Sequence, residues 1–238
     1  MEIKEGIIVK AIDYQDNSKI LTIMTKEGKE TYIVKGAKNY KSKTFAFSQE
    51  ITQLQFNVKK QYITSAKIMR SFPKIKSDVY KLRATMNIID MVYQLSDHIN
   101  NYQIFYDFFS KIINLIEEKN SPYLLELIFK IKLTYLLGIA PNFKTCVVCN
   151  STLNLCYFSL FDGGMKCGYD ANNSDYVVSE EELAYFKELY YTKITDLEEK
   201  LNQYLYMENL NLDINKYYEY FLGFKSNTEQ LFKKIFEK

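Results

Sequence analysis

The chain has 238 residues, of which 47% are hydrophobic and 25% are charged, so it is long enough for one large domain or two modest ones with real cores. No stretch approaches the roughly 20 consecutive apolar residues of a membrane span, and the first residues lack the layout of a signal peptide. We therefore expect a cytoplasmic protein with no membrane contact, whose four cysteines act as thiolates, ligands or core residues and not as disulfides.

The net charge of +2 hides an asymmetry along the chain. Residues 1–75 carry 14 Lys and Arg against 7 Asp and Glu, whereas the remainder carries 17 against 22. A basic module tends to bind phosphate groups, whereas a more acidic part tends to contact protein surfaces or solvent. We therefore expect the two parts to face different partners.

Five short strands are predicted in the first 70 residues, where apolar and polar residues alternate between turn signals. They cover residues 7–12, 20–25, 31–34, 54–58 and 64–69. Five short strands fit a small barrel, and the five-stranded barrel that binds strands of nucleic acid is the oligonucleotide/oligosaccharide-binding (OB) fold. Periodicity alone does not separate this fold from other small barrels.

A dense basic run, from Lys35 to Lys43, interrupts the strand pattern and contains one aromatic residue, Tyr40. In a phosphate-binding loop, the ammonium groups would neutralise backbone charge and Tyr40 would offer a surface for base stacking. The alternative is a solvated lysine loop, and the lysines near the other predicted turns favour the first interpretation. The predicted DNA-binding residues are Lys10, Lys19, Lys35, Lys38, Tyr40, Lys41, Lys43, Lys59 and Lys60.

The pattern becomes helical after residue 73. Three helices are predicted over 77–98, 102–119 and 122–138, with Ser77 and Ser121 as N-caps. Ser179 and Glu182 form a capping box that restarts helix. From there to residue 238 the chain is predicted to be helical, with breaks near Thr195, Asn211 and Asn227.

Two short motifs with metal-ligand spacing, Cys146-Val-Val-Cys149 and Cys167-Gly-Tyr-Asp170, are separated by 17 residues. Two residues between paired ligands allow both to reach one tetrahedral ion, although a carboxylate is a harder ligand for zinc than a thiolate. Cys156 is the substitute if Asp170 does not bind. The predicted site is a structural Zn²⁺ site of Cys146, Cys149, Cys167 and Asp170.

The residues between these motifs predict a hairpin, with Asp162-Gly163-Gly164 at its turn. A zinc-ribbon-like insertion over residues 143–176 is therefore expected. It contains few large apolar residues, so the metal is expected to supply much of its order. A redox dithiol is the alternative for the first motif, but the βαβ pattern that such enzymes need is absent from the sequence.

Nothing in the sequence predicts a catalytic centre. There is no Walker-type glycine loop and no Ser-His-Asp set, the single histidine, His98, has no partner, and the acidic run Glu180–Glu182 is explained by a helix start. The protein is therefore not expected to be an enzyme.

Several weak motifs occur in a specific order and spacing. They are Gly6-Ile7-Ile8-Val9-Lys10, Ser18-Lys19-Ile20-Leu21-Thr22, Val34-Lys35-Gly36-Ala37-Lys38, Leu136-Leu137-Gly138-Ile139-Ala140-Pro141, Cys146-Val147-Val148-Cys149, Phe158-Ser159, Gly163-Gly164 and Tyr220-Phe221-Leu222-Gly223. Over nearly its whole length the chain resembles the bacterial RecO family of DNA repair proteins. The resemblance implies an α+β protein with an OB-fold DNA-binding domain in residues 1–75 and a helical domain in residues 76–238 that carries the zinc-binding insertion.

The resemblance also implies a function. Members of the family are recombination mediators that bind single- and double-stranded DNA, anneal complementary strands and, with RecR, help load RecA on DNA coated by single-strand-binding protein. The C-terminal tail of that protein is a further expected partner, and RecF and RecA are expected to be indirect ones. The rival interpretations are a metal-dependent DNA-processing enzyme and a protein-interaction adaptor with a structural zinc module.

Two groups of residues follow from the resemblance. Cys146, Cys149 and Cys167 match three ligand positions of the family, while Asp170 occupies the fourth, which is usually cysteine. The site is therefore expected to use Asp170, to recruit Cys156 instead or to be lost. The binding site for the acidic tail is expected in the helical region, with Lys81, Arg83, Lys130 and Lys132 as candidates by helix placement.

Overall fold

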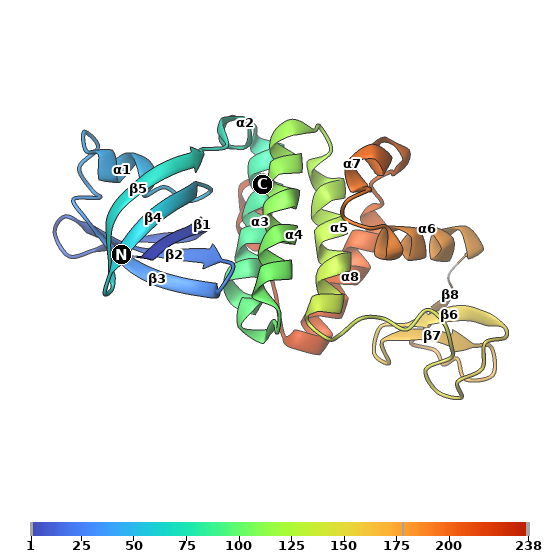
Figure 1. Ribbon diagram of the computed structural model, residues 1–238. Coiled ribbons are helices and arrows are strands. Elements are labelled where there is room, and N and C mark those ends of the chain that lie inside the picture. Colours follow the sequence, from blue (N-terminus) through green and yellow to red (C-terminus); the bar gives the residue numbers. More distant parts are fainter. Residues whose placement is uncertain (1, 178, 237–238) are drawn as a thin grey trace. The chain divides into compact units, whose positions relative to one another are not determined.

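A computed structural model of the chain describes residues 2–177 and 179–236, which form two compact units (Figure 1). The first unit comprises the described residues up to Pro122 together with those from Asn227 onward, and the second comprises Tyr123–Ser226. The domain division at residues 75 and 76 stays a prediction. None of the helices in the described ranges is both long and apolar enough to cross a membrane.

The N-terminal part of the first unit is a closed barrel with the strand order β1-β2-β3-β5-β4 (Figure 1). Neighbouring strands are antiparallel except β3 and β5, which pair in parallel where Ile33 meets Tyr62. This mixed five-stranded barrel confirms the predicted OB-type architecture. The strands are β1 (Glu2–Tyr14), β2 (Ser18–Thr25), β3 (Gly28–Lys35), β4 (Gln53–Lys59) and β5 (Tyr62–Arg70).

The barrel encloses an apolar core that includes Ile8, Leu21, Leu54 and Phe56, all fully buried. Burying such side chains is the main favourable term in folding. Gly6 allows β1 to lie close to β2. A Cβ at this position would lie 2.5 Å from Ile23 Cγ2 and 2.7 Å from the carbonyl oxygen of Met24. No other residue fits there without moving β2.

A short helix, α1 (Lys43–Phe47), lies between β3 and β4 and was not predicted. Ser42 is its N-cap, because its hydroxyl accepts a hydrogen bond from the Phe45 N–H at 3.0 Å. Lys43, which the sequence placed in a loop, is therefore the first helical residue. Ser42 was the available signal, but the five-residue helix is too short to show a periodic pattern.

Four helices complete the first unit. They are α2 (Pro73–Ser77), α3 (Val79–Leu95), α4 (Tyr102–Glu118) and α9 (Asn227–Phe236), with a 3₁₀ turn, η1 (Ser96–His98), after α3. The predicted N-cap Ser77 is wrong, since the carboxylate of Asp78 accepts hydrogen bonds from the N–H groups of Tyr80 and Lys81 and caps α3.

The helices of the first unit contact the barrel through polar side chains. Lys29 Nζ donates to the carboxylate of Asp97 at 2.7 Å. The hydroxyl of Tyr106 on α4 lies 3.4 Å from the carboxylate of Glu5, and burial together with this carboxylate raises the pKa of Tyr106. The barrel and these helices are therefore parts of one packed unit.

The remaining elements of the described residues belong to the second unit, apart from Pro122, the first residue of α5. They are α5 (Pro122–Leu136), β6 (Leu155–Ser159), β7 (Gly164–Cys167), β8 (Tyr176–Val177), α6 (Glu180–Tyr191), α7 (Leu197–Lys200), the 3₁₀ turn η2 (Leu201–Gln203) and α8 (Glu208–Leu222). The predicted capping box is present, with Ser179 and Glu182 bonded reciprocally. The three strands form a small sheet in the order β7-β6-β8, which includes the predicted hairpin (Figure 1).

The break predicted near Asn211 is wrong, because α8 continues through this residue. The buried ammonium of Lys130 donates to Asn211 Oδ1 at 3.0 Å, so the amide has a partner inside the helix bundle. The interruption lies earlier, over residues 204–207. The breaks near Thr195 and Asn227 are confirmed by the end of α6 and the start of α9.

Candidate metal centre and nucleic-acid interface

The backbone around residue 146 is held against strand β7. The Val147 N–H donates to the carbonyl of Met165 at 2.9 Å, and the Met165 N–H donates to the carbonyl of Asn142 at 2.8 Å. A Cβ on Gly164 would lie only 2.6 Å from the Asn142 oxygen, so glycine permits this approach. The two cysteine motifs, distant in sequence, are thereby placed side by side.

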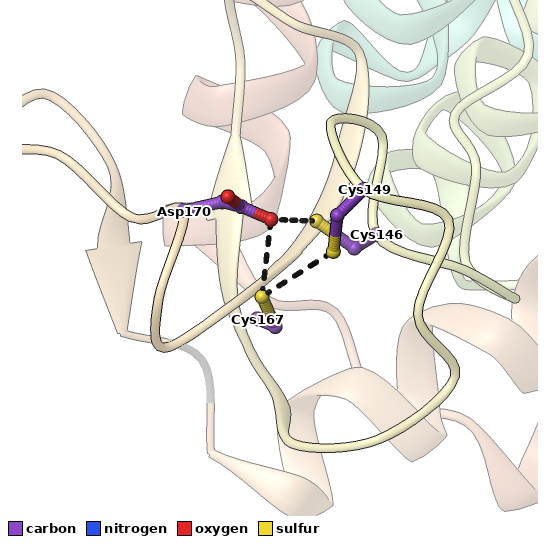
Figure 2. Close-up of side chains that lie close together, drawn as sticks. All are labelled: Cys146, Cys149, Cys167 and Asp170. Carbon is purple, nitrogen blue, oxygen red and sulfur yellow. Dashed lines mark hydrogen bonds between the residues drawn. The ribbon is translucent and has the colours of Figure 1, made fainter.

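Each motif ends in a tight turn. The carbonyl of Cys146 accepts from the N–H of Asn150 at 2.9 Å, and Asn150 has a left-handed backbone with φ of 62°. In the second motif the Asp170 N–H donates to the Cys167 carbonyl at 3.2 Å. These turns direct the two side chains of each motif toward a common point (Figure 2).

One ligand atom from each of Cys146, Cys149, Cys167 and Asp170 lies within 4.8 Å of the other three, and we call these residues the metal-ligand cluster. The Sγ atoms of Cys149 and Cys167 are 3.7 Å apart. Tetrahedral zinc with Zn–S bonds of 2.3 Å separates two sulfurs by about 3.8 Å. Asp170 Oδ2 lies 3.1 Å from the sulfur of Cys146 and 3.2 Å from that of Cys167.

These residues therefore fit a four-coordinate zinc ion, with three thiolates and one carboxylate as donors. Cys146 and Cys167 are buried, Asp170 is half-buried and Cys149 is exposed. Four protein ligands would fill the coordination shell, which is the arrangement of structural sites and not of catalytic ones.

Hydrogen bonds within the metal-ligand cluster shift the pKa values of its members. The carboxylate of Asp170 raises the pKa of Cys149 to about 12, because it accepts a hydrogen bond from the thiol. The thiols of Cys149, Cys146 and Cys167 in turn lower the pKa of Asp170. Burial raises the pKa of Cys146, but backbone N–H groups outweigh it, so that this pKa is lowered overall. Zinc would displace the remaining thiol protons on binding.

Cys156 lies outside the cluster. Its thiol donates to the carbonyl of Asn154 at 3.5 Å, and the group of possible ligands in the described residues does not include it. The geometry therefore favours Asp170 over Cys156 as the fourth ligand.

An aromatic group anchors the insertion. The ring of Phe143 lies 4.7 Å from that of Phe186, 5.6 Å from that of Tyr190 and 6.1 Å from that of Phe158. Phe143, Phe158 and Phe186 are all buried. Two aromatic residues of the insertion, Phe143 and Phe158, therefore share a core with helix α6, so apolar packing also holds the insertion. That the metal supplies much of its order stays a prediction.

Seven predicted DNA-binding lysines gather at one end of the barrel, where three connections meet. Lys38 Nζ donates to the Gln15 carbonyl at 2.7 Å, which links the β3–α1 loop to the β1–β2 turn. The Lys35 ammonium lies 4.9 Å from the ring centroid of Tyr62, which links the end of β3 to the start of β5, just after the β4–β5 turn. We call this surface the basic end; its lysines are Lys19, Lys35, Lys38, Lys41, Lys43, Lys59 and Lys60.

The lysines of the basic end differ in their exposure and in their contacts. Lys35, Lys41, Lys43, Lys59 and Lys60 are exposed. Lys19 is half-buried, with its ammonium 5.5 Å from the ring centroid of Phe45, and Lys38 lies 3.6 Å from the Asp13 carboxylate. Tyr40 is 73% exposed, so its ring is available for stacking. Tyr62 and Phe45 lie against Lys35 and Lys19, and nothing in the sequence beyond their aromatic character indicates this role.

Lys10 is placed differently. It lies in the middle of β1, opposite Thr22, and is half-buried, with its ammonium 4.2 Å from the ring centroid of Tyr93 on α3. This cation–π contact joins the barrel to a helix of the same unit. Lys10 is thus not part of the basic end.

The residues considered for binding an acidic tail are engaged inside the protein. Lys81 is buried and donates to the Glu117 carbonyl, and buried Lys130 forms an ion pair of 2.6 Å with Glu126. Lys132 donates to the carbonyls of Tyr190 and Thr192 at the end of α6, and burial lowers its pKa to about 8. Arg83 lies 6.0 Å from the ring of Phe232. Lys81 and Lys130 are therefore unsuited to rim an open groove.

Comparison with known proteins agrees with these features. The family model "Recombination protein O N terminal" matches residues 1–72, and "Recombination protein O C terminal" matches residues 76–224. The chain belongs to the RecO family. The first match ends just after the barrel, and the second contains the whole metal-ligand cluster, so both candidate sites lie within regions that the family defines.

Three relatives named DNA repair protein RecO illustrate the similarity. The protein of Halalkalibacterium halodurans is 29% identical over 68% of this chain and 66% of its own length, just under two thirds. The protein of Bacillus mycoides is 27% identical over 72% of this chain and 71% of its own length. That of Bacillus cereus strain AH187 is 25% identical over the same shares.

Proposed function

We propose that this RecO-family protein is a recombination mediator that binds single- and double-stranded DNA and anneals complementary strands without catalytic turnover. The observation that carries the proposal is the basic end, where seven lysines and the exposed ring of Tyr40 meet across three connections of an OB-type barrel. Such a combination binds backbone phosphate by charge and bases by stacking.

The physical mechanism is charge neutralisation. Two DNA strands repel each other through their phosphates, and a surface rich in ammonium groups lowers that repulsion while releasing counterions. Complementary bases then find their register without any covalent step. Because Arg70 is the only arginine in residues 1–75, the bidentate guanine contacts typical of sequence readout are not expected, and binding should be sequence-tolerant.

The partners follow from the family. We infer that the protein acts with RecR to help load RecA on DNA coated by single-strand-binding protein, binds the C-terminal tail of that protein and meets RecF and RecA indirectly. With such partners, we infer that the protein works inside the cell, at the nucleoid during repair. Because Lys81 and Lys130 are buried, we expect other lysine or arginine residues to bind the tail.

The metal-ligand cluster would hold a structural Zn²⁺, which when bound supplies cross-links between the two turns of the insertion. The donor set of three thiolates and one carboxylate fills four positions and leaves none for a reacting water. The proposed metal therefore stabilises the fold and does not catalyse DNA cleavage.

The decisive experiment replaces Lys35, Lys38, Lys41 and Lys43 by Glu in the full chain. We expect at least a tenfold loss of affinity for every DNA sequence at low salt, and a slope of log affinity against log salt that is flatter by up to about 2.8 for single strands. Strand annealing should slow in parallel.

A matched control reverses four lysines of the second unit, Lys193, Lys200, Lys216 and Lys225, with the same change in net charge. It should leave DNA affinity and annealing near those of the parent. If the barrel variant anneals as fast as the parent at low salt, the basic end is not the DNA site, and a parent that binds no DNA would favour the adaptor. Cleavage of DNA with a divalent metal would favour the DNA-processing enzyme.

A further inference from the structure

A buried lysine lies beside the metal-ligand cluster but is not one of its ligands. Lys166 precedes the ligand Cys167 on β7 and is 2% exposed. Successive side chains of a strand point to opposite faces, so the ammonium of Lys166 lies on the face away from the Cys167 thiol. There it meets two carboxylates, Asp162 at 2.6 Å and Asp175 at 3.1 Å.

These two ion pairs connect different segments. Asp162 lies in the turn of the β6–β7 hairpin, four residues before Lys166, and its side chain is 47% exposed. Asp175 lies at the far end of the loop 168–175, and its side chain is completely buried. The pair of Lys166 with Asp175 therefore closes the loop that carries Asp170, whereas the pair with Asp162 does not.

Asp175 also orders the loop from within. Its Oδ2 atom accepts a hydrogen bond from the Asn172 N–H at 2.9 Å, and its own N–H donates to the Asn172 carbonyl at 3.0 Å. Its other carboxylate oxygen, Oδ1, is buried and accepts no hydrogen bond from the described residues. The Asn172 N–H, the Ser159 hydroxyl and Lys166 all stabilise the charged form of this carboxylate, and of these three groups only Lys166 carries the positive charge that offsets the cost of burying it.

The strand that follows the loop is too short to fix it alone. Strand β8 has two residues and pairs with β6 only at Tyr157–Val177 and Phe158–Tyr176. Asp170 is two residues before Asn172 and has to hold one carboxylate oxygen near three sulfurs (Figure 2). A mobile loop would lose conformational entropy each time it bound, and a loop that is already closed loses less.

We propose that the Lys166–Asp175 ion pair, here called the ionic clamp, positions Asp170 as the fourth ligand of the metal site. The inference rests on the metal site proposed above. A carboxylate is a weaker structural ligand for zinc than a thiolate, so this site gains more from a ligand held in place before the metal arrives. The lysine thereby assists metal binding through the position of the loop, although it is not itself a ligand.

The test measures the zinc dissociation constant of the full chain by competition with a chromophoric chelator. Asp175→Asn keeps the size of the side chain and its ability to accept from Asn172 but removes the charge, and it should weaken zinc binding about tenfold. Asp162→Asn is the matched control, because it also removes one carboxylate from Lys166 but lies outside the loop. It should change the dissociation constant less than twofold.

Combination with Asp170→Ala separates positioning from a general structural role. Once the ligand is gone, adding Asp175→Asn should weaken zinc binding less than twofold further, since the clamp then has no ligand to position. Lys166→Met removes the same pair from the strand side and should show the same dependence on Asp170, which keeps the test decisive if one variant folds poorly.

Two results would overturn the clamp: an unchanged dissociation constant for Asp175→Asn, or an equal loss with and without Asp170. Failure of the metal site itself is recognised separately. In that case the parent protein would bind no stoichiometric zinc, or Cys167→Ser would bind zinc as tightly as the parent.

Discussion

In the metal-ligand cluster, four atoms lie within 4.8 Å of one another, whereas the lysines of the basic end are distributed over three connections of the barrel. The cluster is held by backbone hydrogen bonds, close approach at Gly164 and the buried ring of Phe143. Most lysines of the basic end project into solvent. A coordination site requires fixed geometry, while phosphate attraction acts over several ångströms and tolerates moving charges.

This difference implies different responses to mutation. Removing one ligand from a four-coordinate site damages the whole site, because the remaining ligands no longer fill the shell. Removing one lysine from a distributed surface removes only one of several contributions to the affinity for phosphate. Single substitutions in the two sites should therefore differ in the size of their effects.

The largest effect is expected for Cys167→Ser, which removes a buried ligand from the centre of the cluster. Zinc affinity should fall about 100-fold or more, since the hydroxyl is a poor replacement for a thiolate. Zinc content after dialysis against a chelator checks this, and hydrogen exchange should show faster exchange in the insertion while the barrel stays protected. Because the aromatic group still anchors the insertion, we expect it to loosen and not to unfold. Retention of stoichiometric zinc would contradict the assignment.

A smaller effect is expected at the fourth ligand. Asp170→Ala should lower zinc affinity about 30-fold, and Asp170→Cys should retain zinc longer against a chelator than the parent, because a thiolate is the softer donor. Cys156→Ala is the control and should change zinc affinity less than twofold, since its thiol lies outside the cluster. A Cys156→Ala protein that loses its zinc would reverse the assignment of the two residues.

The sequence predicted the cluster better than it predicted the fold around it. The spacing of the cysteines identifies ligands directly, because two intervening residues form a turn of fixed size. The aromatic group was missed, since Phe186 lies on a helix far along the chain and periodicity does not reveal which helix covers a hairpin. The clamp was missed for the same reason: Lys166 and Asp175 are ordinary residues in sequence, and only burial distinguishes them.

In the barrel, the five strands were predicted from alternation, but neither their order in the sheet nor the surroundings of each lysine was. Lys10 and Lys41 are indistinguishable by composition, yet one lies against Tyr93 and the other is exposed. Side-chain environment depends on packing between elements that are remote in sequence, which a local pattern does not contain.

The smallest predicted effect tests this last distinction. Lys41→Gln should lower affinity for single-stranded DNA about threefold at low salt and reduce the salt slope by about 0.7, the value for one neutralised phosphate. Lys10→Gln should change the salt slope by less than half as much, because the Lys10 ammonium is half-buried over Tyr93 and faces a helix. Its expected consequence is instead a modest loss of stability from the cation–π contact, measured as a lower midpoint of urea unfolding. Titrations at several salt concentrations check both variants. Equal salt slopes for the two would mean that DNA reaches the middle of β1, and the boundary of the basic end would have to be extended to include Lys10.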